Sequence, residues 1–192
     1  MRVTGGRLGG RRLVAPPSGV RPTADRVREA LFARLADLDG VCVLDLYAGT
    51  GALGIEALSR GAARAVFVER SNASLAALRR NLRTLELDDH ARVVCGDVRG
   101  VLRRLAGEGM RFDLVLADPP YEDRALAAPL ALLVSGGLLA PGATVVVERS
   151  RRHPLPPIEG LVSHGSRRYG DTELEWLGAG DPLSAGEGER DA

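Results

Sequence analysis

The sequence predicts an α/β fold with a doubly wound, mostly parallel sheet. Between residues 41 and 147, short and almost unbroken apolar runs alternate with segments of helical spacing. Runs that are apolar on both faces are typical of parallel strands buried between two helical layers. A chain of 192 residues, 45% of them hydrophobic, is also long enough for a globular domain with a sizeable core. Right-handed crossovers between such strands place helices on both faces of the sheet.

Residues 1–22 predict a small basic β-hairpin ahead of this sheet. Paired glycines and the Pro16-Pro17 step interrupt short apolar and basic stretches, which favours turns and edge strands over helix. Residues 1–24 carry five arginines and no acidic residue, so this segment favours an anionic partner. Behind Thr23, a candidate N-cap, apolar residues recur at helical spacing over residues 24–38 and predict an amphipathic helix closed by Gly40.

Strands and helices alternate in the region that follows. Strands are predicted at the apolar runs 41–48, 65–68, 92–95, 112–117 and 144–147, and helices at 52–60, 72–86, 98–106 and 123–135. After a proline-rich stretch, residues 161–164 and 172–177 flank a turn and predict a closing antiparallel hairpin. We therefore expect a main domain over residues 23–178, followed by a flexible acidic tail over residues 179–192.

A glycine-rich loop follows the first predicted strand. Gly49-Thr50-Gly51-Ala52-Leu53-Gly54 fits the pattern of a nucleotide-binding turn, and Glu69 ends the next strand, where it could accept hydrogen bonds from a ribose. Asp45 stands four residues before the loop, and its carboxylate would repel a pyrophosphate but attract an ammonium group. This arrangement favours S-adenosylmethionine, which carries an ammonium and a sulfonium in place of phosphates, over NAD.

Each of these acidic residues also has a simpler structural interpretation. Asp97 follows the third strand, where it could accept from an adenine amino group while Val98 packs on the ring, or it could merely cap the next helix. Asp45 could bond only loop amides, and Glu69 could form a surface ion pair with Arg70.

The fourth strand delivers Asp118-Pro119-Pro120-Tyr121 to the same sheet edge. An exocyclic amine or a side-chain amide is a poor nucleophile because its lone pair is delocalised. The Asp118 carboxylate and the Pro119 carbonyl, held by two prolines of fixed φ, could accept hydrogen bonds from the two N–H groups of the amine. The nitrogen lone pair would then be free to attack. Tyr121 could stack on a planar substrate. The alternative is that the prolines only end a strand and Tyr121 fills a gap.

Taken together, these motifs resemble the class I S-adenosylmethionine-dependent methyltransferases, and the Asp-Pro-Pro-Tyr form resembles their amino-methylating branch. The stretch Arg21-Pro-Thr-Ala-Asp-Arg-Val-Arg-Glu-Ala-Leu-Phe32, behind a basic hairpin, is similar to the RsmD family of 16S ribosomal RNA guanine-N2 methyltransferases. The resemblance covers residues 2–177 and implies a seven-stranded Rossmann-like sheet. It implies cofactor contacts at Asp45, Tyr47, Gly49, Thr50, Gly51, Gly54, Glu69, Asp97 and Val98, with catalysis by Asp118, Pro119, Pro120 and Tyr121.

The resemblance also implies that the substrate is 16S ribosomal RNA in a partly assembled small subunit. Guanine is chosen by this likeness alone. Candidate RNA contacts are Arg7, Arg11, Arg12, Arg21 and Arg26, although each could be a solvated surface residue. Arg151, Arg152, Arg167 and Arg168 could extend the same face. Deleting residues 1–20 is expected to spare cofactor affinity and weaken RNA binding.

Several other functions remain open. The enzyme could methylate adenine N6 of nucleic acid or a protein glutamine, the chain could be a non-catalytic RNA-binding assembly factor, or it could be an NAD-dependent oxidoreductase. The cysteines and histidines lack metal-ligand spacing, so no metal is expected. No apolar run reaches the roughly 18 residues of a membrane span, and a secretory signal is missing its apolar stretch. We expect a cytoplasmic monomer.

Overall fold

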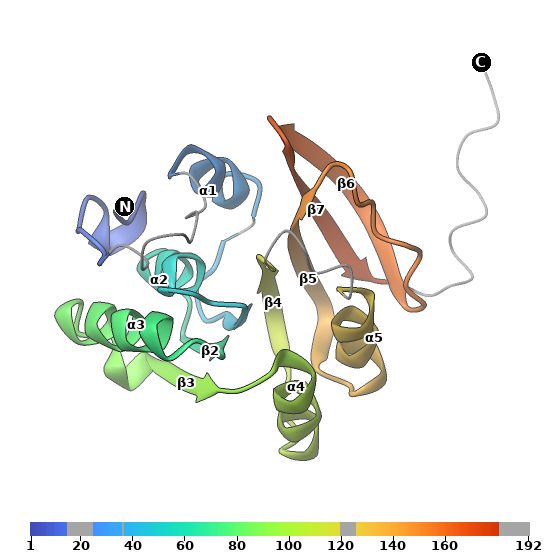
Figure 1. The fold of residues 1–192 in the computed structure, drawn as a ribbon, viewed down its shortest axis with the longest axis horizontal. Coiled ribbons are helices and arrows are strands. Elements are labelled where there is room, and N and C mark those ends of the chain that lie inside the picture. The colour runs from blue at the N-terminus through green and yellow to red at the C-terminus, as the bar shows by residue number, and fades with distance from the viewer. Residues whose placement is uncertain (15–24, 36, 120–125, 181–192) are drawn as a thin grey trace.

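The computed structural model describes residues 1–14, 25–35, 37–119 and 126–180, and contains a seven-stranded sheet between two helical layers (Figure 1). The strand order is β3-β2-β1-β4-β5-β7-β6. Strands β1 to β5 are parallel, and β7 pairs antiparallel with both β5 and β6. The predicted doubly wound sheet with an antiparallel C-terminal hairpin is confirmed. The strands are β1 (Cys42–Leu46), β2 (Arg64–Glu69), β3 (Ala91–Cys95), β4 (Phe112–Ala117), β5 (Leu139–Ser150), β6 (Leu161–Tyr169) and β7 (Thr172–Ala179).

Two core clusters lie on opposite faces of the sheet. Leu31, Ile55 and Leu78 bring three helices onto one face, and Leu102 and Leu130 bring two helices onto the other. The α-helices are α1 (Asp25–Phe32), α2 (Ala52–Ser59), α3 (Asn72–Thr84), α4 (Val98–Gly107) and α5 (Ala127–Ser135), with short 3-10 helices η1 (Gly6–Leu8) and η2 (Asp88–His90). This two-sided cover explains why the strands read as continuous apolar runs.

Several elements differ in length from the predictions. Strand β6 runs to Tyr169, five residues beyond the predicted 161–164, and α5 begins at Ala127 rather than at residue 123. Helix α1 ends at Phe32 rather than near residue 38, although Leu38 is still buried in the same core. Apolar spacing therefore continues past the helix because the turn after it also packs on the sheet. Strand β5 begins at Leu139, five residues earlier than predicted, through Pro141 and a left-handed Gly142 where the pairing with β4 shifts register. Proline and glycine predict a turn here, whereas the sheet accommodates them as an irregularity.

The first 14 residues pack onto helices α1, α2 and α3. Arg2 and Arg12 form an isolated antiparallel bridge around η1, and Val3 and Leu13 are buried in the core. The predicted hairpin therefore takes the form of one bridged turn over the residues that the structure describes. Among these residues no helix is long and apolar enough to cross a membrane.

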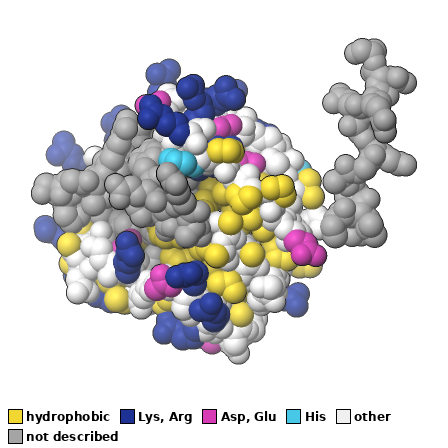
Figure 2. All heavy atoms as spheres, turned by 45° about the vertical axis from the view of Figure 1, so that its right-hand side comes forward, with side chains coloured by type: hydrophobic (Ala, Val, Ile, Leu, Met, Phe, Trp, Pro, Cys, Tyr) yellow, Lys and Arg dark blue, Asp and Glu magenta, His cyan; other side chains and the backbone are white. Residues whose placement is uncertain are grey.

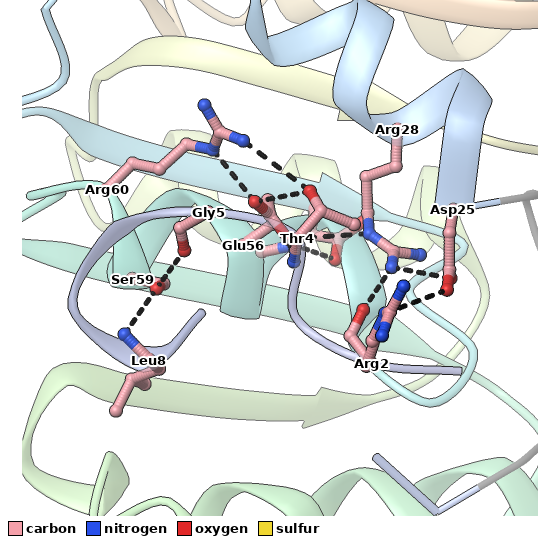
Figure 3. A network of polar contacts seen from close by, with 11 residues as sticks. Arg2, Thr4, Gly5, Leu8, Asp25, Arg28, Glu56, Ser59 and Arg60 are labelled. Atoms are coloured by element: carbon pink, nitrogen blue, oxygen red, sulfur yellow. Dashed lines mark hydrogen bonds and ion pairs between the residues drawn. The ribbon is translucent and has the colours of Figure 1, made fainter. Parts of the chain in front are cut away.

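A buried polar network fastens this segment to the domain (Figure 3). Glu56 of α2, fully buried, accepts from the Thr4 N–H at 2.7 Å and from the Thr4 hydroxyl at 2.8 Å. Arg28 of α1, also fully buried, lies 3.5 Å from Glu56 and donates to the Arg2 carbonyl. Arg60 donates to Glu56 Oε1 at 2.8 Å, the oxygen that also accepts from the Thr4 hydroxyl. The network joins the N-terminal segment, α1 and α2, and buried charges paired in this way fix their relative positions.

Candidate functional site

The carboxyl ends of four parallel strands meet at one edge of the sheet. Leu46 of β1 lies opposite Val68 of β2 and Ala117 of β4, while Glu69 pairs with Cys95 of β3. The acidic residues singled out from the sequence, Asp45, Glu69, Asp97 and Asp118, are therefore brought to this edge. Ligands of open α/β sheets bind at this position.

The glycine loop between β1 and α2 adopts left-handed backbone conformations. Gly49 has a φ of 54° and Gly51 a φ of 84°, and Tyr47, just ahead of them, has a φ of 59°. Left-handed conformations are uncommon outside glycine and cluster at functional sites. Tyr47, for which the resemblance alone implies a cofactor contact, thus has an unusual backbone conformation directly before the glycine loop.

Gly51 and Gly54 are also required for packing. A side-chain carbon at Gly51 would overlap with Leu78 of α3, and one at Gly54 would overlap with Phe67 of β2 and lie 3.0 Å from Asp45 Oδ2. The sequence pattern suggested only a close approach of backbone to ligand. The structure adds that Gly51 makes room for Leu78 of α3 and that Gly54 lets α2 pack closely on β2.

Asp45 lies beneath the loop and is almost completely buried, with 1% of its surface exposed. Its Oδ2 accepts from the Gly54 N–H at 2.9 Å. Burial raises the pKa of Asp45 to about 8; the Gly54 hydrogen bond opposes this shift, and the negative charges of Asp118 and Glu69 add to it. A neighbouring cation would favour the ionised form instead. A cationic group bound beside Asp45 would therefore lower its pKa.

Glu69 holds the loop from the end of β2. Its Oε2 accepts from the Gly49 N–H at 2.8 Å, and its Oε1 accepts from the backbone N–H groups of Arg70 and Ser71 at 2.8 and 2.7 Å. The contact with Arg70 involves its backbone N–H, in contrast to the side-chain ion pair considered from the sequence. The carboxylate orients the loop, and its role as a ribose acceptor remains a prediction.

Asp97 caps helix α4, as its simpler interpretation suggested. Its Oδ1 accepts from the N–H groups of Arg99 and Gly100 at 3.1 and 3.3 Å, and 63% of its side chain is exposed. Val98 is buried in the core cluster of α4 and α5. The proposed adenine contacts of both residues remain predictions.

Asn81 is a site-supporting residue that the sequence reasoning missed. It is buried on α3, and its Nδ2 donates to the carbonyl of Thr50 in the glycine loop at 3.0 Å. Its Oδ1 accepts from the Val14 N–H at 2.7 Å. The available signal was an Asn in the apolar stripe formed by Leu78 and Leu82, where a polar side chain needs a buried partner.

Asp118 and Pro119 follow β4 directly and are half-buried. Asp118 is close enough to Asp45 for its charge to raise the Asp45 pKa. Pro120 and Tyr121 lie outside the described residues, as does Arg21. The structure thus brings together Asp45, Glu69 and Asp118 beside the glycine loop. Among the described residues, no group of three or more His, Cys, Asp or Glu side chains is arranged to hold a metal ion.

The candidate RNA contacts lie in two places. Arg7, Arg11 and Arg12 are exposed on the N-terminal segment, and Arg26 is exposed on α1. Arg11 donates to the Thr84 carbonyl at the end of α3 at 3.2 Å. Their role in RNA binding remains a prediction, and Arg28, which sequence reasoning did not single out, is a buried structural residue of the same region.

Comparisons with known proteins agree with this architecture. The family described as Conserved hypothetical protein 95 matches residues 1–178. Ribosomal RNA small subunit methyltransferase D of Escherichia coli is 42% identical over 161 residues, which cover 82% of this chain and 79% of that protein. Its namesake from Haemophilus influenzae is 35% identical, with 81% of each chain covered. The solved structure of yhhF from Escherichia coli has a TM-score of 0.83 at 37% identity and covers 93% of this chain and 97% of its own.

Proposed function

Because the chain belongs to the Conserved hypothetical protein 95 family, we propose that it is an S-adenosylmethionine-dependent methyltransferase of small-subunit ribosomal RNA. The relatives from Escherichia coli and Haemophilus influenzae are named for this activity, and we propose the same activity for this chain. The acceptor atom that we propose is the exocyclic N2 of one guanine.

The observation that carries the proposal is the group of three carboxylates beside the glycine loop. Asp45 is buried with a raised pKa, and the charges of Asp118 and Glu69 contribute to that shift. A ligand with phosphate groups would add further negative charge, whereas one with an ammonium and a sulfonium would relieve the repulsion. The charge balance of the site thus supports S-adenosylmethionine and disfavours NAD.

The residues of this chain divide the work between binding and activation. Asp45 and the loop from Gly49 to Gly54 would hold the amino-acid end of the methyl donor, and Glu69 its ribose. Asp97 and Val98 would face the adenine. When bound, S-adenosylmethionine supplies an electrophilic methyl group.

Asp118 and Pro119 would hold the acceptor amine next to the donor. Asp118 would accept a hydrogen bond from one N–H of the guanine amino group and the Pro119 carbonyl would accept one from the other, which would free the nitrogen lone pair for the methyl group that the donor supplies. Positioning of this kind contributes a large part of the rate when the electrophile is already reactive. Pro120 and Tyr121 would complete the grip, with Tyr121 stacking on the base.

The substrate is expected to be a base that can leave its stack. Extruding an unpaired loop base costs less than opening a paired one, so a loop guanine suits this site. We further propose that the enzyme acts in the cytoplasm as a monomer, on a partly assembled small subunit rather than on free RNA.

Nucleoside mass spectrometry tests the proposed function. The protein is incubated with methyl-labelled S-adenosylmethionine and small subunits from a strain that lacks its own enzyme of this family, and the ribosomal RNA is digested. We expect label in N2-methylguanosine only. Label in another nucleoside would reject guanine N2, and label in ribosomal protein, or in no product, would reject RNA methylation.

A further inference from the structure

The two halves of the site edge carry different chemistry. Asp45, Glu69 and Asp97 lie at the ends of β1, β2 and β3, on one side of β4, so a cofactor bound by them occupies that half. Asp118 ends β4 at the boundary. Strands β5, β7 and β6 form the other half. A polynucleotide whose base reaches Asp118 can therefore run along β5 to β6, on the side of β4 away from the cofactor.

Four exposed arginines lie at the far corner of this half: Arg151, Arg152, Arg167 and Arg168, which we call the basic corner. Ser150, the last residue of β5, pairs with Thr172 of β7, which in turn pairs with Tyr169 of β6. The Arg151 N–H donates to the Asp171 carbonyl in the turn between β6 and β7 at 3.0 Å. The two chain segments that carry these arginines are thus joined through β7 and its turn into one corner.

At the site edge, the basic corner extends beyond the end of β4, the strand that Asp118 follows. Ala117, the last residue of β4, pairs with Val147, so β5 continues three residues further to Ser150. At about 3.3 Å per residue this extends the sheet by about 10 Å past the start of the Asp118 segment. Figure 1 shows the β6–β7 turn rising well above the end of β4. An extension of this length is comparable to the backbone spacing of a few nucleotides.

The acidic residues next to the basic corner pair mainly with Arg149, so the four arginines of the corner keep most of their charge exposed to solvent. Glu173 lies 3.2 Å from Arg149, and Glu175 accepts from Arg149 at 2.9 Å, with all three side chains largely buried. The hydroxyl of Ser166 and the surrounding arginines lower the pKa of Glu173. Arg168 reaches Glu173 only at 4.0 Å and is 70% exposed. Dark blue side chains gather at the top of the molecule in Figure 2, where Figure 1 places this end of the hairpin.

We propose that the basic corner is a phosphate-binding surface that holds the RNA backbone next to the extruded guanine. This inference rests on the proposed function. Guanidinium groups bind phosphate oxygens with two parallel hydrogen bonds, and every one of the 26 basic residues of this chain is arginine. A corner on the β5–β6 half of the site edge can contact the same RNA strand that delivers the base.

The N-terminal arginines lie away from the site edge, whereas the basic corner lies on it. Leu8 is bonded to Ser59 at the end of α2, and the glycine loop lies at the opposite end of that helix. Eight helical residues separate the two by about 12 Å along the axis. Arg7 and Arg11 therefore lie over the cofactor half of the domain, away from the carboxyl edge.

A matched pair of triple variants tests this proposal. Arg151→Ala/Arg152→Ala/Arg167→Ala removes three charges from the basic corner and leaves Arg168 beside Glu173. Arg79→Ala/Arg80→Ala/Arg83→Ala removes three exposed charges from α3. Affinity for small subunits is measured at several KCl concentrations, together with S-adenosylmethionine affinity. We expect the corner variant to bind subunits at least tenfold more weakly and to lose about two to three units of salt slope, while the α3 variant resembles wild type.

The outcomes separate this inference from the proposed function. If the wild type binds subunits through the corner but transfers no methyl group to RNA, the function fails and the surface stands. If the wild type methylates RNA and both triple variants bind equally well, the surface is rejected and the function stands. Weaker binding with an unchanged salt slope would indicate a ribosomal protein contact, and it would also reject the phosphate role.

Discussion

Asp118 is the side chain on which methyl transfer should depend most. Asp118→Ala removes the acceptor of one N–H bond, so kcat for RNA methylation is expected to fall by at least about 100-fold. The affinity for S-adenosylmethionine, measured by calorimetry, should fall much less than kcat, because Asp45, Glu69 and the glycine loop, which would bind the donor, are unchanged. Asp118→Asn retains an acceptor oxygen and should keep more activity than the alanine variant. Turnover at the wild-type rate in Asp118→Ala would remove this residue from the mechanism.

Asp45 trades stability for cofactor binding. Its pKa is raised from 3.8 to about 8 in the folded protein, chiefly by burial. Below about pH 4 the folded and unfolded chains both hold the proton, and between there and about pH 8 only the folded chain does. Stability therefore falls as the pH rises across this window and levels off above it.

Asp45→Asn removes this titration, which gives a signed prediction. The melting temperature of the variant minus that of the wild type should increase by about 3 °C or more between pH 5 and pH 8, and then stay constant. The same variant should bind S-adenosylmethionine at least tenfold more weakly, because the amide carries no charge for the ammonium. Thermal unfolding without cofactor checks the first result, and calorimetry checks the second. If the melting temperatures of the two proteins change with pH in parallel, Asp45 does not titrate in this range.

Helix α2 requires a glycine at position 54, whereas the glycine at position 100 of α4 is not required for packing. Gly54→Ala would push a methyl group into Phe67 and disturb the Gly54 hydrogen bond to Asp45, so we expect a loss of about 1–3 kcal/mol. Gly100 lies in the first turn of α4, and a side-chain carbon there would meet no atom within 4 Å. Gly100→Ala should therefore stabilise the protein by about 0.5–1 kcal/mol. Urea unfolding of both variants measures the contrast, and equal effects would contradict it.

Periodicity predicted the elements well because the sheet is buried on both faces. The predicted strand over 112–117 coincides with β4, and α2 to α4 lie within one or two residues of their predicted ends. The prediction was less accurate at Pro141 and Gly142, where local turn chemistry is overridden by pairing with β4. The carboxylates of the site were found because strand ends are visible in the sequence. Asn81 and Arg28 were missed because their partners, Thr50 and Glu56, become neighbours only in the folded chain.

At the scale of the whole molecule, the N-terminal segment stabilises the domain through buried contacts. Val3 and Leu13 complete the core under α1, Thr4 satisfies both oxygens of the buried Glu56, and Val14 holds Asn81 beneath the glycine loop. The segment is therefore connected to the cofactor loop through Asn81 and Thr50. The structure revises the expectation that this segment can be deleted without affecting the cofactor.

Deleting residues 1–14 should therefore impair the whole protein. Exposing the sites of Val3 and Leu13 alone costs about 3–6 kcal/mol, and Glu56, Arg28 and Asn81 lose partners as well. We expect a lower melting temperature and weaker S-adenosylmethionine binding, measured by thermal unfolding and calorimetry. The control is Arg7→Ala/Arg12→Ala, which changes two exposed side chains of the same segment and should alter the melting temperature by no more than about 1 °C. A deletion variant that melts and binds cofactor like the full chain would show that the segment is an independent appendage, because its buried contacts would then contribute nothing to the domain.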